Sequence, residues 1–352
     1  MRVFAQLPTE DWTRTAEAAR RAEAAGYDGV SSNELAHDPF LPLVVAAQAT
    51  KHVKLNTSIA VAFPRSPMIV ANMSRDLHAN TGGRFELGLG SQVKGHNERR
   101  FSVKWTAPVA RMREYVQSLR AIWRCWEEGE KLDFQGDHYS FTLMTPEFSP
   151  PKTGLPVFPV TCAAVGPDML RMAGRICDGV RLHGFCTREY IEQVCMERIG
   201  EGLARGNRRR EHLEISGGGF IATGPDEATV TKMMDWVRYR VGFYGSTRTY
   251  LPVFAVHGLE NLGMKLHRMS VEGRWNELAD QVSDDVVRLF AAVGTYDELP
   301  QAIEKRYGGV VDVIKLDMPD DIDPDHHAEL VNRIKQIPCE FRGFTAEASA
   351  AA

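Results

Sequence analysis

The chain has 352 residues, of which 42 are lysine or arginine and 46 are aspartate or glutamate, giving a formal net charge of −4 at pH 7. This balance argues against a nucleic-acid partner, which needs a clustered basic face. The composition, 43% hydrophobic and 25% charged, is ordinary for a globular protein. It argues against a chain that is mostly disordered. This length predicts either two domains or one large barrel.

The chain carries no sign of export, membrane insertion or a metal knuckle. No run approaches the ~18 consecutive apolar residues that a membrane helix needs, and the acidic Glu10 and Asp11 stand where a signal peptide would have its apolar stretch. No C-x-x-C pair occurs, so free thiols in a reducing compartment are favoured over disulfides or a metal site. We therefore expect a cytoplasmic protein without a membrane partner or a metal. The cysteines are Cys125, Cys162, Cys177, Cys186, Cys195 and Cys339.

Short apolar runs alternate with amphipathic segments, a pattern typical of parallel strands that are covered by helices. The predicted strands are Arg2–Leu7, Tyr27–Asn33, Val53–Val61, Phe85–Gly90, Val157–Ala164, Gly179–His183, Leu213–Ala222 and Val310–Leu316. The predicted helices are Asp11–Ala25, Pro39–Lys51, Pro67–Asn80, Pro108–Glu128, Asp168–Ile176, Arg188–Arg205, Asp226–Val241 and Pro324–Ile337.

Repeated strand–helix units predict a (β/α)8 barrel in a single domain, residues 1–342. The alternative is a doubly wound sheet, but Leu7-Pro8-Thr9-Glu10 stands where its G-x-G-x-x-G turn would follow the first strand. Two insertions are expected: a hairpin-like one at about 131–150 and a helical one at 242–285, the latter at the catalytic face. The tail 343–352 is expected to be disordered.

In a (β/α)8 barrel the chemistry lies at the carboxyl ends of the strands. Asn33 and Glu34 follow the second predicted strand, Gly90 and Ser91 lie at the end of the fourth, and His183 ends the sixth. Glu34 and His183 are titratable, which makes them candidates for acid–base chemistry. The alternative is that Glu34 is an ordinary surface charge and His183 a hydrogen-bonded polar residue.

The fifth predicted strand runs into a helix through small residues and a proline that suits the first helical turn. Such a start leaves backbone N–H groups free and directs the positive end of the helix dipole at whatever binds, which favours an anion. The alternative is a plain loop between strand and helix. The candidate anion-binding residues are Ala163, Ala164, Val165, Gly166 and Pro167.

Several short motifs follow one another along nearly the whole chain. They are Gly26-Tyr27-Asp28-Gly29, Asp38-Pro39-Phe40, Pro64-Arg65-Ser66-Pro67, Gly82-Gly83-Arg84-Phe85, Leu87-Gly88-Leu89-Gly90, Arg113-Glu114-Tyr115-Val116, Ala164-Val165-Gly166-Pro167, Ala173-Gly174 and Asp178-Gly179. In this order they resemble the bacterial luciferase-like flavin and deazaflavin oxidoreductases. Phe243-Tyr244-Gly245-Ser246-Thr247, followed by Tyr250, is similar to the branch that uses the deazaflavin coenzyme F420.

This resemblance implies a barrel in which the flat ring of the cofactor lies across the strand ends. It also implies a cis peptide bond between Ser58 and Ile59 that backs the ring, a feature that is rare outside proline. Asn97 falls where relatives contact the cofactor, and Gly166 and Pro167 fall in the loop that binds its phosphate.

The function implied by the resemblance is hydride transfer between F420 and a small, largely apolar organic substrate. Asn33 and Glu34 stand where relatives hold Asp and His, and we predict that Asn33, Glu34 and His183 are the catalytic side chains. One alternative is an FMN-dependent monooxygenase of the same fold, whose reduced flavin reacts with oxygen. Another is a flavin- or deazaflavin-binding protein without turnover. The resemblance also implies a homodimer.

The segment 242–285 is rich in apolar residues and too long for a solvated loop. We predict that Phe243, Tyr244 and Tyr250 wall an apolar substrate pocket and that the segment closes over it as a lid. A closed lid would exclude water from the transferred hydride. The alternative is a helical pair that only pads the barrel.

Overall fold

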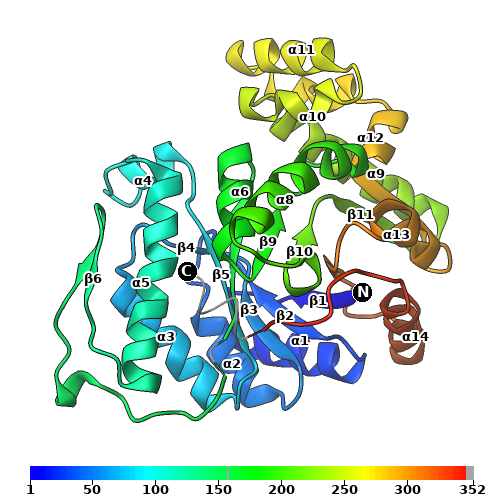
Figure 1. Ribbon diagram of the computed structural model, residues 1–352. Helices are drawn as coiled ribbons and strands as arrows, with labels where there is room; N and C mark the ends of the chain where they lie inside the picture. Colours follow the sequence, from blue (N-terminus) through cyan, green and yellow to red (C-terminus); the bar gives the residue numbers. More distant parts are fainter. Residues whose placement is uncertain (157, 346–352) are drawn as a thin grey trace. The chain divides into compact units, whose positions relative to one another are not determined.

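The structure is a computed structural model that describes residues 1–156 and 158–345 of the chain (Figure 1). Its contacts divide the chain into two compact units. The larger unit comprises Phe4–Arg181, Arg198–Glu214 and the described residues from 341 to 345. The smaller unit comprises Met1–Val3, Leu182–Glu197 and Ile215–Glu340. Within the described ranges, no helix combines the length and apolar character that a membrane crossing requires.

The main sheet contains the eight strands of a closed parallel barrel, which confirms the predicted (β/α)8 fold. Each strand is hydrogen-bonded to its successor along the chain, and the last is bonded to the first. The barrel strands are β1 (Arg2–Gln6), β2 (Gly29–Ser32), β3 (Lys54–Thr57), β5 (Phe85–Gly90), β8 (Val160–Ala164), β9 (Gly179–Leu182), β10 (Glu214–Gly217) and β13 (Val313–Lys315). The predicted start of the fifth strand, Val157, lies outside the described residues, as does the tail from residue 346.

The strands β3 and β5 of the larger unit approach closely because β5 has a glycine, Gly88, opposite Thr57. All six residues of β5 are buried, as expected for a parallel strand that is covered on both faces. The Thr57 hydroxyl donates to the Gly88 carbonyl at 2.7 Å and accepts from the Gly88 N–H at 2.9 Å. A Cβ atom at Gly88 would lie 2.0 Å from the Thr57 carbonyl oxygen, so only glycine allows this approach. The short strand β4 (Ala60–Val61) pairs with the end of β5.

Helices of the larger unit begin and end where capping chemistry predicts. Asp11 accepts from the N–H groups of Thr13 and Arg14 at the start of the first helix, and Ser66 accepts from Met68 at the start of the third. Gly129, in the left-handed region with φ 83°, ends the fifth helix. Five of these helices are blue or cyan in Figure 1: α1 (Trp12–Ala24), α2 (Leu41–Ala49), α3 (Pro67–Asn80), α4 (Lys94–Arg99) and α5 (Pro108–Glu128). The sixth, α6 (Pro167–Ile176), is green.

The expected hairpin near 131–150 is present as a short antiparallel pair, β6 (Phe134–Gln135) and β7 (Ser140–Phe141), followed by the helical turn η1 (Pro146–Phe148). The predicted helix 188–205 is built from three consecutive pieces rather than one regular helix. They are α7 (Arg188–Tyr190), the π-helix η2 (Ile191–Cys195) and α8 (Met196–Arg205). The turn η3 (Arg210–His212) precedes β10.

The prediction of a single seventh strand, 213–222, was wrong. The strand breaks at Gly217, Gly218 and Gly219, which have φ values of 84°, 89° and 159°. A Cβ atom at Gly217 would lie 2.5 Å from the Leu182 carbonyl oxygen, so the backbone turns where no side chain could fit. After the break, β11 (Phe220–Gly224) leaves the barrel sheet and pairs in parallel with β12 (Ala291–Thr295). This second sheet was not predicted.

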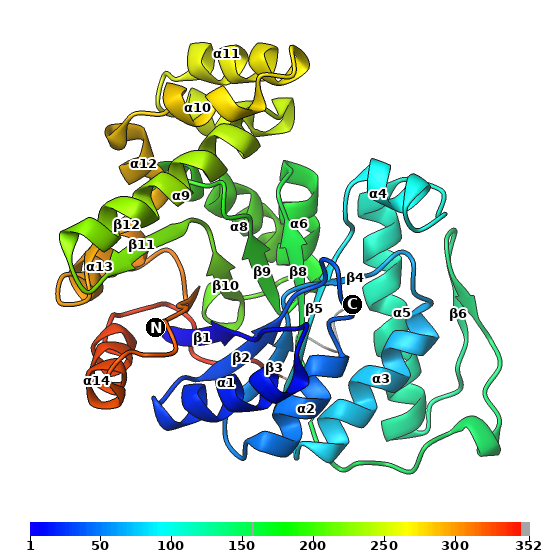
Figure 2. The same cartoon turned by 180° about the vertical axis from the view of Figure 1, so that it is seen from behind.

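The segment between β11 and β12 is helical, as expected from its sequence. Its first helix extends to Gly245, beyond the predicted end at Val241. Figure 2 shows α10 and α11 side by side within this segment. Its elements are α9 (Glu227–Gly245), η4 (Arg248–Tyr250), α10 (Leu251–Ala255), α11 (Glu260–Val271), η5 (Trp275–Glu277), η6 (Ala279–Gln281) and α12 (Asp284–Phe290). The next helix is α13 (Leu299–Tyr307), which was not predicted, and the last helix of the described residues is α14 (Pro324–Lys335).

Candidate functional site

The end of β2 carries an ion pair that the sequence did not reveal. Glu34 Oε2 lies 2.7 Å from Arg65 Nη1 and also accepts from the Val61 N–H at 2.7 Å. Arg65 Nη2 donates to Asp38 at 2.9 Å. The side chain of Glu34 is 7% exposed, so the pair is shielded from water. Asn33 is partly buried, and its side chain makes no hydrogen bond to the described part of the chain.

The peptide bond between Ser58 and Ile59 is cis, which confirms that prediction. Ile59 lies directly over the end of β5, because a Cβ atom at Gly90 would lie 2.7 Å from Ile59 Cδ1. The same point is 3.5 Å from Ala163 Cβ, at the end of β8. The ends of β5 and β8 therefore present a surface of backbone and small side chains, with Ile59 packed against it.

Next to this surface, Asn97 is held by the loop that follows β5. Its side chain is fully buried on α4. Nδ2 donates to the carbonyl oxygens of Ser91, at 2.9 Å, and Val93, at 3.1 Å. Oδ1 has no hydrogen-bond partner among the described residues. An unpartnered buried acceptor is costly, so this oxygen is suited to accept from a bound molecule.

The first turn of α6 is open, as the Ala-Val-Gly-Pro run predicted. Gly166 is the N-cap and offers no side chain, so no side chain caps the helix. Pro167 occupies the first helical position, and a Cβ atom at Gly166 would meet nothing within 4 Å. Ala164 is buried, whereas Val165 is 38% exposed. The N–H groups of this turn are therefore available to an anion.

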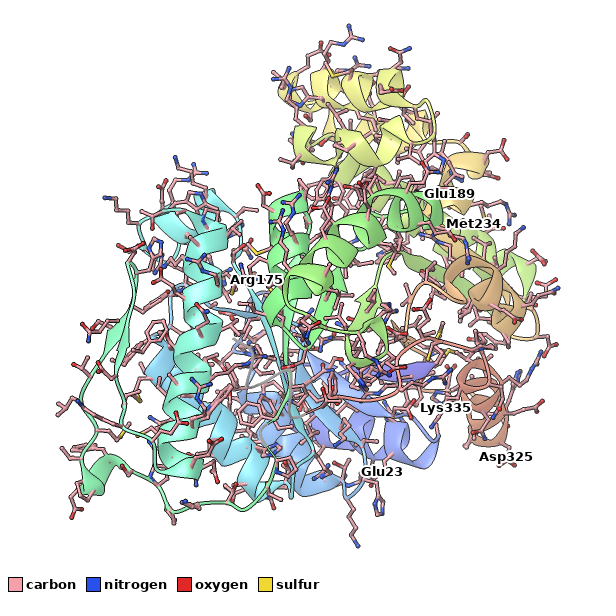
Figure 3. The ribbon with its side chains drawn as sticks, viewed as in Figure 1. Glu23, Arg175, Glu189, Met234, Asp325 and Lys335 are labelled. Atoms are coloured by element: carbon pink, nitrogen blue, oxygen red, sulfur yellow. The ribbon has the colours of Figure 1, made fainter. Side chains whose placement is uncertain are left out.

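Two charged residues of α6, Asp168 and Arg171, form ion pairs. Asp168, in the first turn, binds Arg171, which also donates to Glu201 at 2.6 Å. Figure 3 labels Arg175 in the last turn of the same helix. The negative charge of Asp168 is thus partly offset by Arg171, which reduces its repulsion of an anion at the helix start.

In the smaller unit, His183 follows β9 and lies within an aromatic cluster. Its ring is nearly parallel to that of Tyr250, with centroids 5.0 Å apart and a 27° angle. Tyr244 contacts it edge-on at 4.7 Å and 86°. Burial lowers the pKa of His183 to about 4, so the imidazole is neutral at pH 7. Two of the predicted pocket residues are therefore brought together around the predicted titratable residue.

The third predicted pocket residue, Phe243, lies apart from His183. Its side chain is 41% exposed. It stacks on Tyr239 at 6.3 Å and contacts Trp275 at 6.0 Å. Its only link to the His183 cluster within the described chain is an edge contact with Tyr244 at 5.3 Å.

Two residues of these sites were missed. Phe185 contacts Tyr250 at 5.2 Å and Phe254 at 5.3 Å, and completes the His183 cluster. Its position gave no usable signal, because the chain bends at Gly184 and Phe185 and the alternation of a strand does not continue there. Arg65 gave no signal either, since it lies 31 residues from Glu34 in a separate loop.

The comparisons with known proteins agree with the barrel fold. The family model of luciferase-like monooxygenases matches residues 2–312. An uncharacterized protein of Mycobacterium tuberculosis is 43% identical over 299 residues, covering 85% of this chain and 88% of that protein. A 5,10-methylenetetrahydromethanopterin reductase of Archaeoglobus fulgidus is 26% identical over 303 residues, covering 83% of this chain and 86% of the relative.

Among solved structures, the coenzyme F420-dependent tetrahydromethanopterin reductase of Methanopyrus kandleri has the same fold. It aligns with 96% of this chain and 97% of its own length, at a TM-score of 0.75 and 18% identity. The chain therefore belongs to the luciferase-like monooxygenase family.

Proposed function

We propose that the protein is an oxidoreductase that transfers a hydride between coenzyme F420 and a small, largely apolar organic substrate. The observation that carries the proposal is the open first turn of α6, which directs free N–H groups outward beside the end of β8. A phosphorylated cofactor needs such an anion site. F420-linked names among the sequence relatives, such as a putative coenzyme F420-dependent oxidoreductase of Mycobacterium tuberculosis, favour the deazaflavin over FMN.

The larger unit also fits the flat ring of such a cofactor. The ends of β5 and β8 are formed by Gly90 and Ala163, which leave the backbone accessible, and Ile59 packs beside them. The buried Asn97 Oδ1 lacks a partner among the described residues and can accept from a ring N–H. In this proposal Gly166 and Pro167 hold the phosphate, and Ser58, Ile59, Gly90 and Asn97 hold the ring.

When bound, a deazaflavin supplies or accepts the hydride, and the protein fixes the reacting atoms in place. Glu34 engages Arg65 and the Val61 N–H at the same time, each at 2.7 Å. We therefore assign Glu34 the role of positioning the loop after β4, in place of the acid–base role predicted from its sequence position.

Cofactor titration of the purified protein tests the proposal. We expect F420 to bind more tightly than FMN. A Gly166→Asp variant should bind F420 more weakly, because its carboxylate would occupy the anion site. The melting temperature of Gly166→Asp should equal or exceed that of the unmodified protein, since aspartate is a favourable N-cap. Gly166→Ser is the matched control, which adds a neutral cap at the same position.

The two alternatives predict different results in the same titration. Tight FMN binding without F420 binding would overturn the proposal and favour an FMN-dependent monooxygenase, the activity in the name of the matching family. Binding of F420 with no turnover of any substrate would favour a cofactor-binding protein. Unchanged F420 affinity in Gly166→Asp would remove α6 from the cofactor site.

We also propose that the protein is a homodimer. Leu41 and Val44 on α2 are 51% and 47% exposed, whereas Leu43 of the same helix is buried. An apolar helix face in water favours association with another surface. A second copy of the chain would cover these side chains.

A further inference from the structure

A cavity of the larger unit lies at the amino ends of the barrel strands. Its volume is about 870 Å³, and its wall includes the first residue of β3, residues shortly before β5 and β8, and the last turns of α5. Because a strand rises about 3.3 Å per residue, the length of β5 separates this cavity from the surface at Gly90 by roughly 16 Å. A small molecule in the cavity would therefore not touch a cofactor at the carboxyl ends of these strands.

Arg120, on the wall of this cavity, carries a buried charge that is only partly paired. Its side chain is 2% exposed. Nη2 donates to Asp178 Oδ2 at 3.1 Å, whereas Nη1 has no hydrogen-bond partner among the described residues. A guanidinium only donates hydrogen bonds, and a buried donor without an acceptor is costly. Arg120 is therefore suited to donate to an acceptor on a bound molecule.

The carboxylate of Asp178 does not neutralise this cluster, because two arginines share it. Arg208 Nη2 lies 3.8 Å from Asp178 Oδ1. The Nη1 group of Arg208 donates to the backbone carbonyl oxygens of Gly174 and Cys177, which carry no net charge. Two guanidinium groups and one carboxylate leave one excess positive charge in a buried cluster. Burying unpaired charge is costly, so an anion beside Arg120 would be stabilised.

Lys54 adds a second cation to the wall, and it has no carboxylate partner among the described residues. Its Nζ donates to the Gly83 carbonyl oxygen at 3.1 Å, which leaves the other N–H groups of the ammonium for a ligand. His78, also on the wall, adds no charge at pH 7, because burial lowers the pKa of its imidazole. Its ring packs against Phe158, with centroids 4.8 Å apart.

The carboxylates around the cavity do not cancel these two cations. Glu127 lies 3.3 Å from Arg75, with which it forms an ion pair. Glu130 pairs in the same way with Arg124, at 3.2 Å. Glu128 is exposed, where water and salt screen its charge. The cavity therefore keeps its positive character.

Apolar side chains form much of the remaining wall, namely Leu155, Pro156, Phe158, Pro159 and Phe344. A small hydrated anion would leave this apolar surface unused. We propose that the cavity binds an apolar organic carboxylate, whose charged group lies at Lys54 and Arg120 and whose body packs on the apolar wall. This site is separate from the cofactor site at α6 and does not depend on the proposed hydride transfer.

Equilibrium dialysis of the full-length protein with 2-naphthoate tests the proposal. We expect saturable binding. 2-Naphthamide, which has the same apolar body without the charge, should bind roughly 10-fold more weakly. Inorganic phosphate at the same concentration should not displace 2-naphthoate, because it gains nothing from the apolar wall. Absence of saturable binding, equal affinities for the acid and the amide, or displacement by phosphate would overturn the proposal.

A variant at Lys54 ties the binding to this cavity. Lys54→Gln removes one charge but keeps a donor for the Gly83 carbonyl oxygen, so the protein should fold as before. It should weaken 2-naphthoate binding about 5-fold, which is the upper range for an ion pair that is partly open to water. Lys51→Gln is the matched control, because it makes the same change on an exposed side chain that does not line the cavity. An unchanged affinity in Lys54→Gln, or an equal loss in Lys51→Gln, would overturn the proposal.

The Gly166→Asp variant distinguishes this cavity from the open first turn of α6. It should bind 2-naphthoate as tightly as the unmodified protein does, because the two sites lie at opposite ends of the strands. A loss of 2-naphthoate binding in Gly166→Asp would overturn the proposal by placing the anion at α6. If F420 does not bind but Lys54→Gln weakens 2-naphthoate binding as expected, the cofactor proposal fails and the carboxylate site stands.

Discussion

Arg65 lies 2.7 Å from Glu34 and 2.9 Å from Asp38, and so joins the loop after β2 to the loop after β4. Glu34 also accepts a hydrogen bond from the Val61 N–H. One guanidinium thus orders two strand ends beside the cis peptide at Ser58-Ile59. The segment that carries Ile59 is positioned by charge as well as by packing.

This ion pair predicts a large stability effect. Glu34→Ala leaves the mostly buried Arg65 with Asp38 alone and leaves the Val61 N–H without its acceptor. Breaking a fully buried pair costs about 3–5 kcal/mol, and the remaining Asp38 contact should reduce this to about 2 kcal/mol. Urea unfolding measures the change.

A double-mutant cycle is the control for this prediction. Arg65→Met in the Glu34→Ala background removes the unpaired charge and should recover part of the lost free energy of unfolding. Additive losses in the double variant would show that Glu34 and Arg65 do not stabilise each other.

The second prediction concerns Gly88. An added Cβ atom would lie 2.0 Å from the Thr57 carbonyl oxygen, which is backbone and cannot rotate away. Gly88→Ala should therefore destabilise the protein by about 3 kcal/mol or more, as overpacking of a core does. Gly166→Ala is the matched control, because its Cβ atom meets nothing within 4 Å. Equal melting temperatures for the two variants would contradict the strand spacing seen here.

Sequence periodicity was enough to predict the barrel, because buried strands and amphipathic helices leave local patterns. It did not predict the break at Gly217, since a run of glycines is compatible with a bulge as well as with a strand that leaves the sheet. Nor could it pair Arg65 with Glu34, whose contact depends on how distant loops meet. The open first turn of α6 was predictable, because Gly166 and Pro167 are local signals.

The third prediction follows from the titration of His183, whose pKa in the folded protein is about 4, below its ordinary value of 6.5. Between these values the unfolded chain binds a proton that the folded protein excludes. Stability contributed by the neutral ring is therefore present above pH 6.5 and is lost as the pH falls toward 4, by up to about 3 kcal/mol.

Unfolding free energies of the unmodified protein and of His183→Phe, measured between pH 7 and pH 4.5, check this prediction. Burial also lowers the pKa of His78, so both proteins should lose stability with acid. The loss should be smaller in His183→Phe, because the variant has no ring to protonate at this position. Identical pH profiles would show that His183 does not resist protonation in the folded state.

The last prediction tests the outer face of α2 as a dimer interface. Leu41 and Val44 are about half exposed on one helix, and replacing both by glutamate would place two negative charges in any surface that covers them. Burying unpaired charge is costly, so Leu41→Glu, Val44→Glu should convert a dimer into a monomer of 39.3 kDa in light scattering. The melting temperature at high dilution should change little, because neither side chain belongs to the core. Leu35→Glu, at a position that is 68% exposed outside this helix, should leave the dimer intact. A monomeric mass for the unmodified protein at micromolar concentration would remove the interface altogether.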